Sequence, residues 1–218
     1  FDMKIKEIKS ITDLDRIKRS NLINSITGIS SANLVGTISN DMKENLSIIS
    51  SVVHIGSNPP LLGFILRPSK KTRRDTYENI FETNQFTINH IHSKMITRSH
   101  YTSTKFQKHE SEFDKCKLTP EYLNRFKAPY VKESYIKIGL DLEDIHLIKS
   151  NGCRLIIGKI KHIFMPHNAI QKDGNIQLEL LDSVGVNGLY TYYSLNKIAE
   201  YSYARINDTF FKKFSIND

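Results

Sequence analysis

Short polar side chains interrupt an apolar stretch of the sequence, residues 45–68, in a pattern that could bind a planar ligand. The stretch is NLSIISSVVHIGSNPPLLGFILRP, and its polar members are Asn45, Ser47, Ser50, Ser51 and His54. An ordinary core strand carries few such groups, whereas amides and hydroxyls held rigidly on one face can hydrogen-bond a flat polar ring. Serines of a strand edge with nothing bound are the alternative. The pattern favours a ligand site on this stretch.

A basic run follows this stretch and could hold a phosphate. Five positive charges occupy eight positions, namely Arg67, Lys70, Lys71, Arg73 and Arg74. The run leads into a helix start at Asp75–Thr76, and the free amides and dipole of a helix N-terminus favour anions. Arginine adds bidentate contacts to phosphate. We therefore expect Arg67, Arg74 and Thr76 to bind a phosphate, with Arg73 as the alternate. Asp75 opposes this because it repels an anion, and a solvated loop is the other interpretation.

The histidines and cysteines give weaker signals. His90 and His92 lie two residues apart in a predicted strand and therefore on one face, and His100 follows. No carboxylate or cysteine stands at a suitable interval, so no metal site is predicted. These histidines are expected either to be half-buried or to line a ligand. Cys116 and Cys153 have no base nearby in the sequence, so nucleophilic catalysis is not predicted. No residue is assigned a catalytic role.

Strands and one short helix must position these groups. Prolines 59 and 60 and the many β-branched residues favour two strands joined by a turn at GSNPP over one helix. Asp75 or Thr76 is expected to cap a helix through TYENIFETN that stops at Asn84. The alternation in QFTINHIH, residues 85–92, predicts another strand.

The remaining segments predict an antiparallel barrel within a single domain, residues 1–218. Residues 1–20 are expected to form an entry arm. Residues 21–39 are expected to supply a strand that forms a hairpin with the first strand of residues 45–68. Residues 93–135 are a mixed helical insertion, with helix-like pieces in TSTKFQKHESEF and TPEYLNRF. Strands return in residues 134–148 and 153–165 around an Asn-Gly turn. Many strands and few helices favour a closed antiparallel barrel.

Composition limits the function classes. The chain has 218 residues, 39% of them hydrophobic, and a net charge of +8. A basic balance suits phosphate-bearing ligands, and without a nucleic-acid motif no nucleic-acid partner is expected. No apolar run reaches the roughly 18 residues of a membrane helix, and the charged start FDMKIKEIKS is not a secretory signal. Two distant cysteines form no disulfide framework. A cytoplasmic protein without a membrane partner is therefore expected.

Four pieces together resemble the flavin reductase-like, FMN-binding split-barrel family: NLSIISS (45–51), NPPLLGFILRP (58–68), RRDTYENI (73–80) and FTINHI (86–91). The resemblance extends over roughly residues 15 to 205. It implies a mainly β fold, an antiparallel Greek-key-type split barrel with a helical excursion. It also implies that Asn45, Ser47, Ser50 and Ser51 line a flavin. His54, by its place in the same stretch, is expected to line the flavin edge or a nicotinamide slot. Two departures from the family pattern are Leu46-Ser47-Ile48 where Gly-(Met)-Thr is usual, and Val52 where an aromatic residue is frequent.

A further piece of the resemblance concerns Ser103. Thr102, Ser103, Lys105 and Phe106 are similar to a Ser-x-x-Phe element of the family that can reach the neighbouring subunit's flavin. An ordinary helix start is the alternative. The family also implies a homodimer, which fits the apolar surface expected of residues 93–135 and of the tyrosine-rich tail.

The resemblance implies an NAD(P)H-dependent flavin oxidoreductase in which hydride passes from nicotinamide to the N5 atom of FMN. Such a protein positions two rings and needs no acid or base of its own. An FMN-binding electron carrier of the flavoredoxin type, without a nicotinamide site, is the second hypothesis. A ligand-binding barrel with no redox role is the third.

Overall fold

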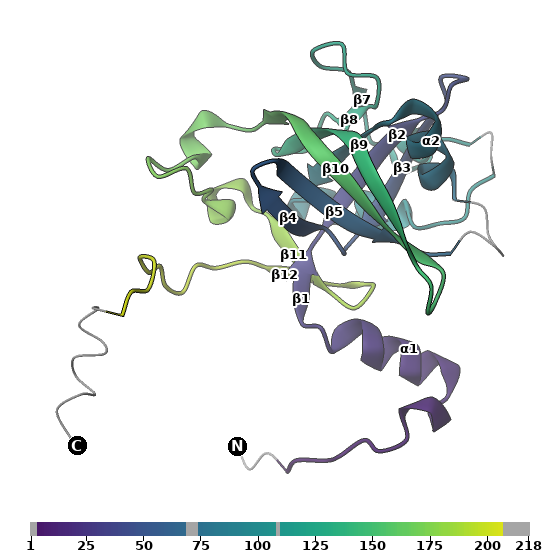
Figure 1. Ribbon diagram of the computed structural model, residues 1–218, viewed down its shortest axis with the longest axis vertical. Coiled ribbons are helices and arrows are strands. Elements are labelled where there is room, and N and C mark those ends of the chain that lie inside the picture. Colours follow the sequence, from purple (N-terminus) through teal and green to yellow (C-terminus); the bar gives the residue numbers. More distant parts are fainter. Residues whose placement is uncertain (1–3, 69–73, 108–109, 207–218) are drawn as a thin grey trace.

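The computed structural model describes residues 4–68, 74–107 and 110–206, and a seven-stranded sheet forms its centre (Figure 1). The strand order is β3-β2-β6-β9-β10-β5-β4, and all neighbours are antiparallel. The strands are β2 (Asn33–Ile38), β3 (Glu44–Ile49), β4 (Val53–Ser57), β5 (Pro60–Leu66), β6 (Gln85–His90), β9 (Lys137–Ile148) and β10 (Cys153–Phe164). The prediction of a mainly β, antiparallel fold is confirmed.

The two edge strands show that this sheet is curled. β3 and β4 stand at opposite ends of the strand order, yet only residues 50–52 join them. Four residue steps span at most about 14 Å, whereas seven flat strands would be about 29 Å wide. The sheet must therefore roll until its edges approach each other.

The connection between β3 and β4 corrects one prediction. We expected residues 45–55 to form one strand, but β3 ends at Ile49 and β4 begins at Val53. The Ser51 side chain explains the break, because its Oγ accepts a hydrogen bond from the Ile65 amide (3.0 Å) and donates one to the Ile65 carbonyl (3.3 Å). The Ser51 side chain thus replaces backbone pairing to Ile65 where the chain passes from edge strand β3 to edge strand β4.

An apolar core fills the curled sheet. The Phe64 and Phe86 rings meet edge to face at 5.5 Å, and both side chains are fully buried. A Cβ atom at position 158 would lie 2.4 Å from the Phe86 ring, so glycine is required there. Ile80 of helix α2 (Asp75–Thr83) belongs to the same core. The core therefore fixes α2 against the barrel.

The C-terminal end of α2 lies where the sequence predicted it, whereas the N-terminal end does not. Asn84 adopts the left-handed conformation with φ of 56° and ends the helix, as predicted. The N-cap is Arg74 rather than Asp75 or Thr76, and its side chain makes no capping hydrogen bond. Asp75 and Thr76 instead lie within the first turn, so the predicted cap was wrong by one or two residues.

The 93–135 insertion contains less helix than predicted. Its elements are η2 (Ser93–Met95), α3 (Ile96–Tyr101), α4 (Glu112–Cys116), β7 (Pro120–Glu121) and β8 (Tyr130–Val131). The TPEYLNRF piece forms β7 and a turn rather than a helix, because Asn124 and Arg125 have φ of 50° and 58°. Phe113, Cys116 and Val131 are buried in a second core together with Leu34 and Leu46. The insertion thus buries part of its apolar surface against β2 and β3, while Tyr101 and Tyr122 remain exposed.

The remaining elements lie outside the barrel. They are η1 (Ile11–Asp13), α1 (Arg16–Ser25), β1 (Ile29–Ser31), η3 (His167–Ala169), η4 (Leu178–Leu181), β11 (Val184–Asn187) and β12 (Thr191–Ser194). β1, β11 and β12 form a small separate sheet. α1 begins inside the predicted entry arm, has no buried residue, and projects away from the barrel, as do residues 195–206 (Figure 1). Among the described residues, no helix has the length and apolar character needed to cross a membrane.

Candidate functional site

A hydrogen-bonded network joins β3 to the first turn of α2. Asn45 and Ser47 lie two residues apart on β3 and so share one face. The Thr76 Oγ1 atom lies 3.1 Å from Asn45 Nδ2, which donates to it, and 2.7 Å from Ser47 Oγ. Three residues predicted at the site are therefore brought together, although 31 positions separate Asn45 from Thr76.

Two further side chains complete this β3–α2 network. Asn45 Nδ2 and Asn79 Nδ2 both donate to Thr37 Oγ1 of β2, at 3.0 and 3.1 Å. Asn45 and Thr76 are 8% and 5% exposed, so these atoms serve one another rather than solvent. Asn45 and Thr76 thus position the start of α2 relative to the strand, a role that the sequence alone did not predict.

Arg74 stands directly before this first turn, and the environment of its side-chain Nε atom is unusual. That atom is buried and finds no hydrogen-bond partner among residues 4–68, 74–107 and 110–206. A buried donor left unpaired costs roughly 1–3 kcal/mol, so it points to a missing acceptor. Arg67 is exposed just after β5. The predicted basic residues Lys70, Lys71 and Arg73 lie outside the described residues.

Sequence reasoning missed Arg154 of β10. Its guanidinium carbon lies 4.3 Å from the centre of the Tyr77 ring, next to Thr76 in α2. Arg154 also pairs in register with Leu66, one residue from Arg67. A third arginine therefore stands close to the start of α2. Strand pairing brings it there, and a single sequence does not reveal which strand pairs with β5.

Glu112 of α4 was also missed. Its Oε2 accepts a hydrogen bond from the Leu46 amide at 3.1 Å, on the free edge of β3. Burial raises the pKa of the Glu112 carboxyl, while the Leu46 hydrogen bond acts in the opposite direction. Burial also raises the pKa of the Cys116 thiol, which keeps it protonated. Glu112 thus holds the outer edge of the strand that carries Asn45 and Ser47.

The other predicted site residues lie away from this network. Ser50 is half-buried in the bend after β3, where Ser51 turns its side chain to Ile65. His54 is exposed on β4, with its Nε2 3.2 Å from Ser57 Oγ. Ser103 is exposed after α3 and donates to the His100 carbonyl at 2.8 Å. His54 and Ser103 therefore form no hydrogen bond to the β3–α2 network.

Residues 29–183 match the sequence model of a protein family, the flavin reductase like domain. These residues include the whole barrel and the β3–α2 network. The chain belongs to this family. A candidate flavin reductase with a split barrel domain from Shewanella frigidimarina NCIMB 400 is 43% identical, with a TM-score of 0.85 over 89% of this chain and 96% of that one. The split barrel predicted for this flavin reductase-like protein is thereby confirmed.

More distant solved structures share the fold. Nitrilotriacetate monooxygenase component B from Bacillus cereus is 21% identical, with a TM-score of 0.80 over 92% of this chain and 100% of that chain. Flavoredoxin of Desulfovibrio vulgaris (Miyazaki F) is 24% identical, with a TM-score of 0.70 over 81% and 92% of the two chains. The split barrel is thus common to a monooxygenase component and a flavoredoxin, so the fold alone does not assign a function.

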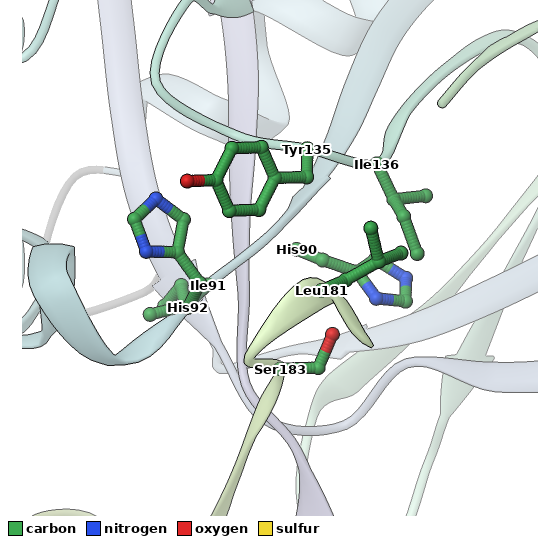
Figure 2. A pocket seen from close by; sticks show the side chains of 7 residues that line it. All are labelled: His90, Ile91, His92, Tyr135, Ile136, Leu181 and Ser183. Atoms are coloured by element: carbon green, nitrogen blue, oxygen red, sulfur yellow. The ribbon is translucent and has the colours of Figure 1, made fainter. Parts of the chain in front are cut away.

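The two histidines of NHIH differ from each other in this flavin reductase-like chain. β6 ends at His90, and the His92 ring stacks on Tyr135 at 4.5 Å, with its Nε2 3.1 Å from the Glu133 carbonyl. Figure 2 shows His92 with Tyr135, and His90 apart from them beside Leu181 and Ser183. Burial lowers the pKa of His90 from 6.5 to about 4. Among the described residues, no three potential metal ligands cluster.

Proposed function

We propose that this protein is an NAD(P)H-dependent flavin oxidoreductase that binds FMN. The observation that carries the proposal is the buried Arg74 Nε at the start of α2, held beside a β3–α2 network in a chain of the flavin reductase like family. An anion at this helix start would give the Arg74 donor its missing acceptor. FMN carries such an anion at one end and a flat polar ring at the other.

Arg74 and Arg67 would hold the FMN phosphate. The helix N-terminus adds backbone amides and a favourable dipole. Asp75 and Glu78 place two carboxylates in the first turn of α2, so the arginine charges must outweigh a local repulsion. The phosphate therefore depends on arginine more than on the helix dipole.

The ring end of FMN would lie along the end of β3 and the following bend. We assign Ser47 and Ser50 as hydroxyl contacts and Ser51 as a backbone contact, because its side chain already bonds Ile65. Asn45 and Thr76 would act as positioning residues through their mutual hydrogen bond. His54 would border the ring, and Ser103 would reach the flavin of a second subunit.

The chain would contribute orientation rather than acid–base chemistry. A bound flavin accepts hydride at N5 from a nicotinamide, which needs the two rings stacked and water excluded. Nothing in this step requires a protein proton donor. That is consistent with a site made of hydroxyls, amides and arginines.

We further propose a cytoplasmic, single-domain homodimer. Ile198, Tyr201 and Tyr203 of the tail are 99%, 89% and 87% exposed, and α1 has no buried residue. A second copy of the chain would cover these apolar side chains. The 93–135 insertion, which we had expected to contribute to such a surface, buries part of its apolar side chains but leaves Tyr101 and Tyr122 exposed.

One spectroscopic experiment tests the activity. The purified protein is mixed with FMN, freed of excess flavin, and titrated with NADH and then NADPH under anaerobic conditions. The proposal expects retained flavin absorbance that bleaches with at least one nicotinamide. Retained flavin that neither nicotinamide bleaches would favour the electron carrier. Failure to retain flavin would refute both.

A further inference from the structure

A cavity unrelated to the β3–α2 network lies where β6 ends. Its volume is about 220 Å³, and it is bounded by β1, the end of β6 and β11. Apolar residues of its wall include Ile29, Ala32, Ile91 and Val184. The polar residues that line it are Ser30, Ser31, His90 and Ser183. Ile29 is itself 56% exposed, so the cavity reaches the surface beside it.

The register of the sheet separates this cavity from the network. Asn33 of β2 pairs with His90, whereas Thr37 pairs with Asn45. Four strand positions correspond to about 13 Å. The cavity therefore lies at the opposite end of β2 from the proposed phosphate contacts.

His90 is the titratable side chain of this wall. No hydrogen bond within the described residues reaches its ring nitrogens, and burial alone lowers the pKa of the ring to about 4. At neutral pH it is an uncharged imidazole with one donor and one acceptor. Figure 2 shows the ring beside Leu181, with the Ser183 hydroxyl nearby. The half-buried ring can therefore hydrogen-bond a molecule in the cavity.

We propose that this cavity binds a neutral, single-ring aromatic compound carrying one hydrogen-bonding substituent, with the His90 ring as its polar partner. Size sets the upper limit. An apolar cavity of about 150 Å³ holds benzene, whereas drug-sized ligands need about 300 Å³ or more. A volume of about 220 Å³ therefore fits one substituted ring and excludes the three fused rings of a flavin.

The absence of charge from the cavity wall limits the ligand to a neutral compound. The cavity wall contains no Asp, Glu, Lys or Arg side chain. An anion entering it would lose its hydration without meeting a counter-charge, which is costly. A neutral phenol or a similar compound loses little water and gains one hydrogen bond. The inference needs no flavin, so it stands or falls separately from the proposed activity.

The test uses phenol, toluene and benzoate as probes of the full-length protein. Ligand-observed NMR titration gives a dissociation constant for each. We expect phenol to bind about tenfold more tightly than toluene, since one hydrogen bond separates them, and benzoate to bind much more weakly than either. His90→Leu should remove the preference for phenol while keeping toluene binding, which also shows that the variant is folded. His162→Leu, a barrel histidine outside the cavity, should change nothing.

Three results would overturn the proposal: no binding of phenol, benzoate binding as tightly as phenol, or an unchanged phenol preference in His90→Leu. If that variant does not fold, nitrogen chemical shifts of the His90 ring in the unmodified protein replace it. The proposal then requires these shifts to change on adding phenol and to stay unchanged on adding toluene.

Discussion

The β3–α2 network and the His90 cavity treat buried polar groups in opposite ways. In the network, Thr37, Asn45, Thr76 and Asn79 hydrogen-bond one another, and none has a buried polar atom left unpaired within the described residues. In the cavity wall, the half-buried His90 side chain forms no hydrogen bond within the described residues. Both regions lie on β2 and β6 or next to them, so the barrel itself does not account for the difference.

The contrast separates two roles for polar residues. A satisfied network fixes geometry, because every change leaves some partner unpaired. An unpaired group costs stability and is retained where something outside the chain can pair with it. Arg74 resembles His90 in this respect, although it stands directly beside the network. Experiments on each residue can therefore sharpen or break the distinction.

The largest effect is expected from His90. Because its folded pKa is about 4 against an ordinary value of 6.5, the unfolded chain takes up the proton first as the pH falls. The free energy of unfolding should therefore drop as the pH falls from about 6.5 to about 4, by up to about 3 kcal/mol. Urea unfolding across this range should show a flatter profile for His90→Gln. His162→Gln is the control, and identical profiles for parent and His90→Gln would contradict a desolvated His90.

The next effect concerns Arg74. Arg74→Ala should weaken FMN roughly ten- to a hundredfold, or about 1.5–3 kcal/mol, while riboflavin binding changes little because riboflavin lacks the phosphate. Fluorescence titration of both flavins measures this, with the α1 surface variant Arg16→Ala as the control. Arg67→Ala should act in the same direction. Equal losses for both flavins would mean that arginine acts through folding.

Within the network, Asn45→Ala should lower the free energy of unfolding by about 2 kcal/mol. The substitution removes the donor to both Thr37 and Thr76 and leaves these buried hydroxyls short of a partner. Chemical denaturation gives the value, and Asn168→Ala at an exposed position of η3 is the matched control. If both variants are equally stable, the network does not fix the start of α2.

The smallest effects distinguish Ser50 from Ser51. Ser51→Ala loses both hydrogen bonds to Ile65 and should cost about 1 kcal/mol of stability, with FMN affinity almost unchanged. Ser50→Val should keep the fold and weaken FMN roughly tenfold. Circular dichroism and flavin titration of both proteins decide this. If both variants bind FMN like the parent, this stretch is not a flavin site.

Local signals in the sequence predicted the elements that depend on neighbours in the chain. The end of α2 at Asn84 and the β9–β10 hairpin at Gly152, with its φ of 75°, follow from residues within a few positions. The break of the strand at residues 50–52 did not, because β-branched residues on both sides favour continuing it. The curling of the whole sheet requires the break, and the hydrogen bonds between Ser51 and the distant Ile65 stabilise it.

The site was predictable to a similar extent. The order of Asn45, Ser47 and Thr76 indicated one region, and the structure joins these side chains. Arg154 and Glu112 reach that region from β10 and α4 through strand pairing and packing, which carry no signature in nearby residues. The segregation of His90 from His92 depends on where β6 ends, and strand ends are poorly specified by sequence.

Glu112 has a consequence for how this protein avoids unwanted self-association. The free edge of a sheet offers unpaired amides to strands of other chains, which promotes aggregation. On β3 the Glu112 carboxylate already occupies the Leu46 amide, with α4 packed alongside. On β4, at the other edge, Val53, His54 and Ile55 are exposed. Any intermolecular strand addition should therefore begin at β4, whose backbone amides donate no such hydrogen bond to a side chain of the described residues.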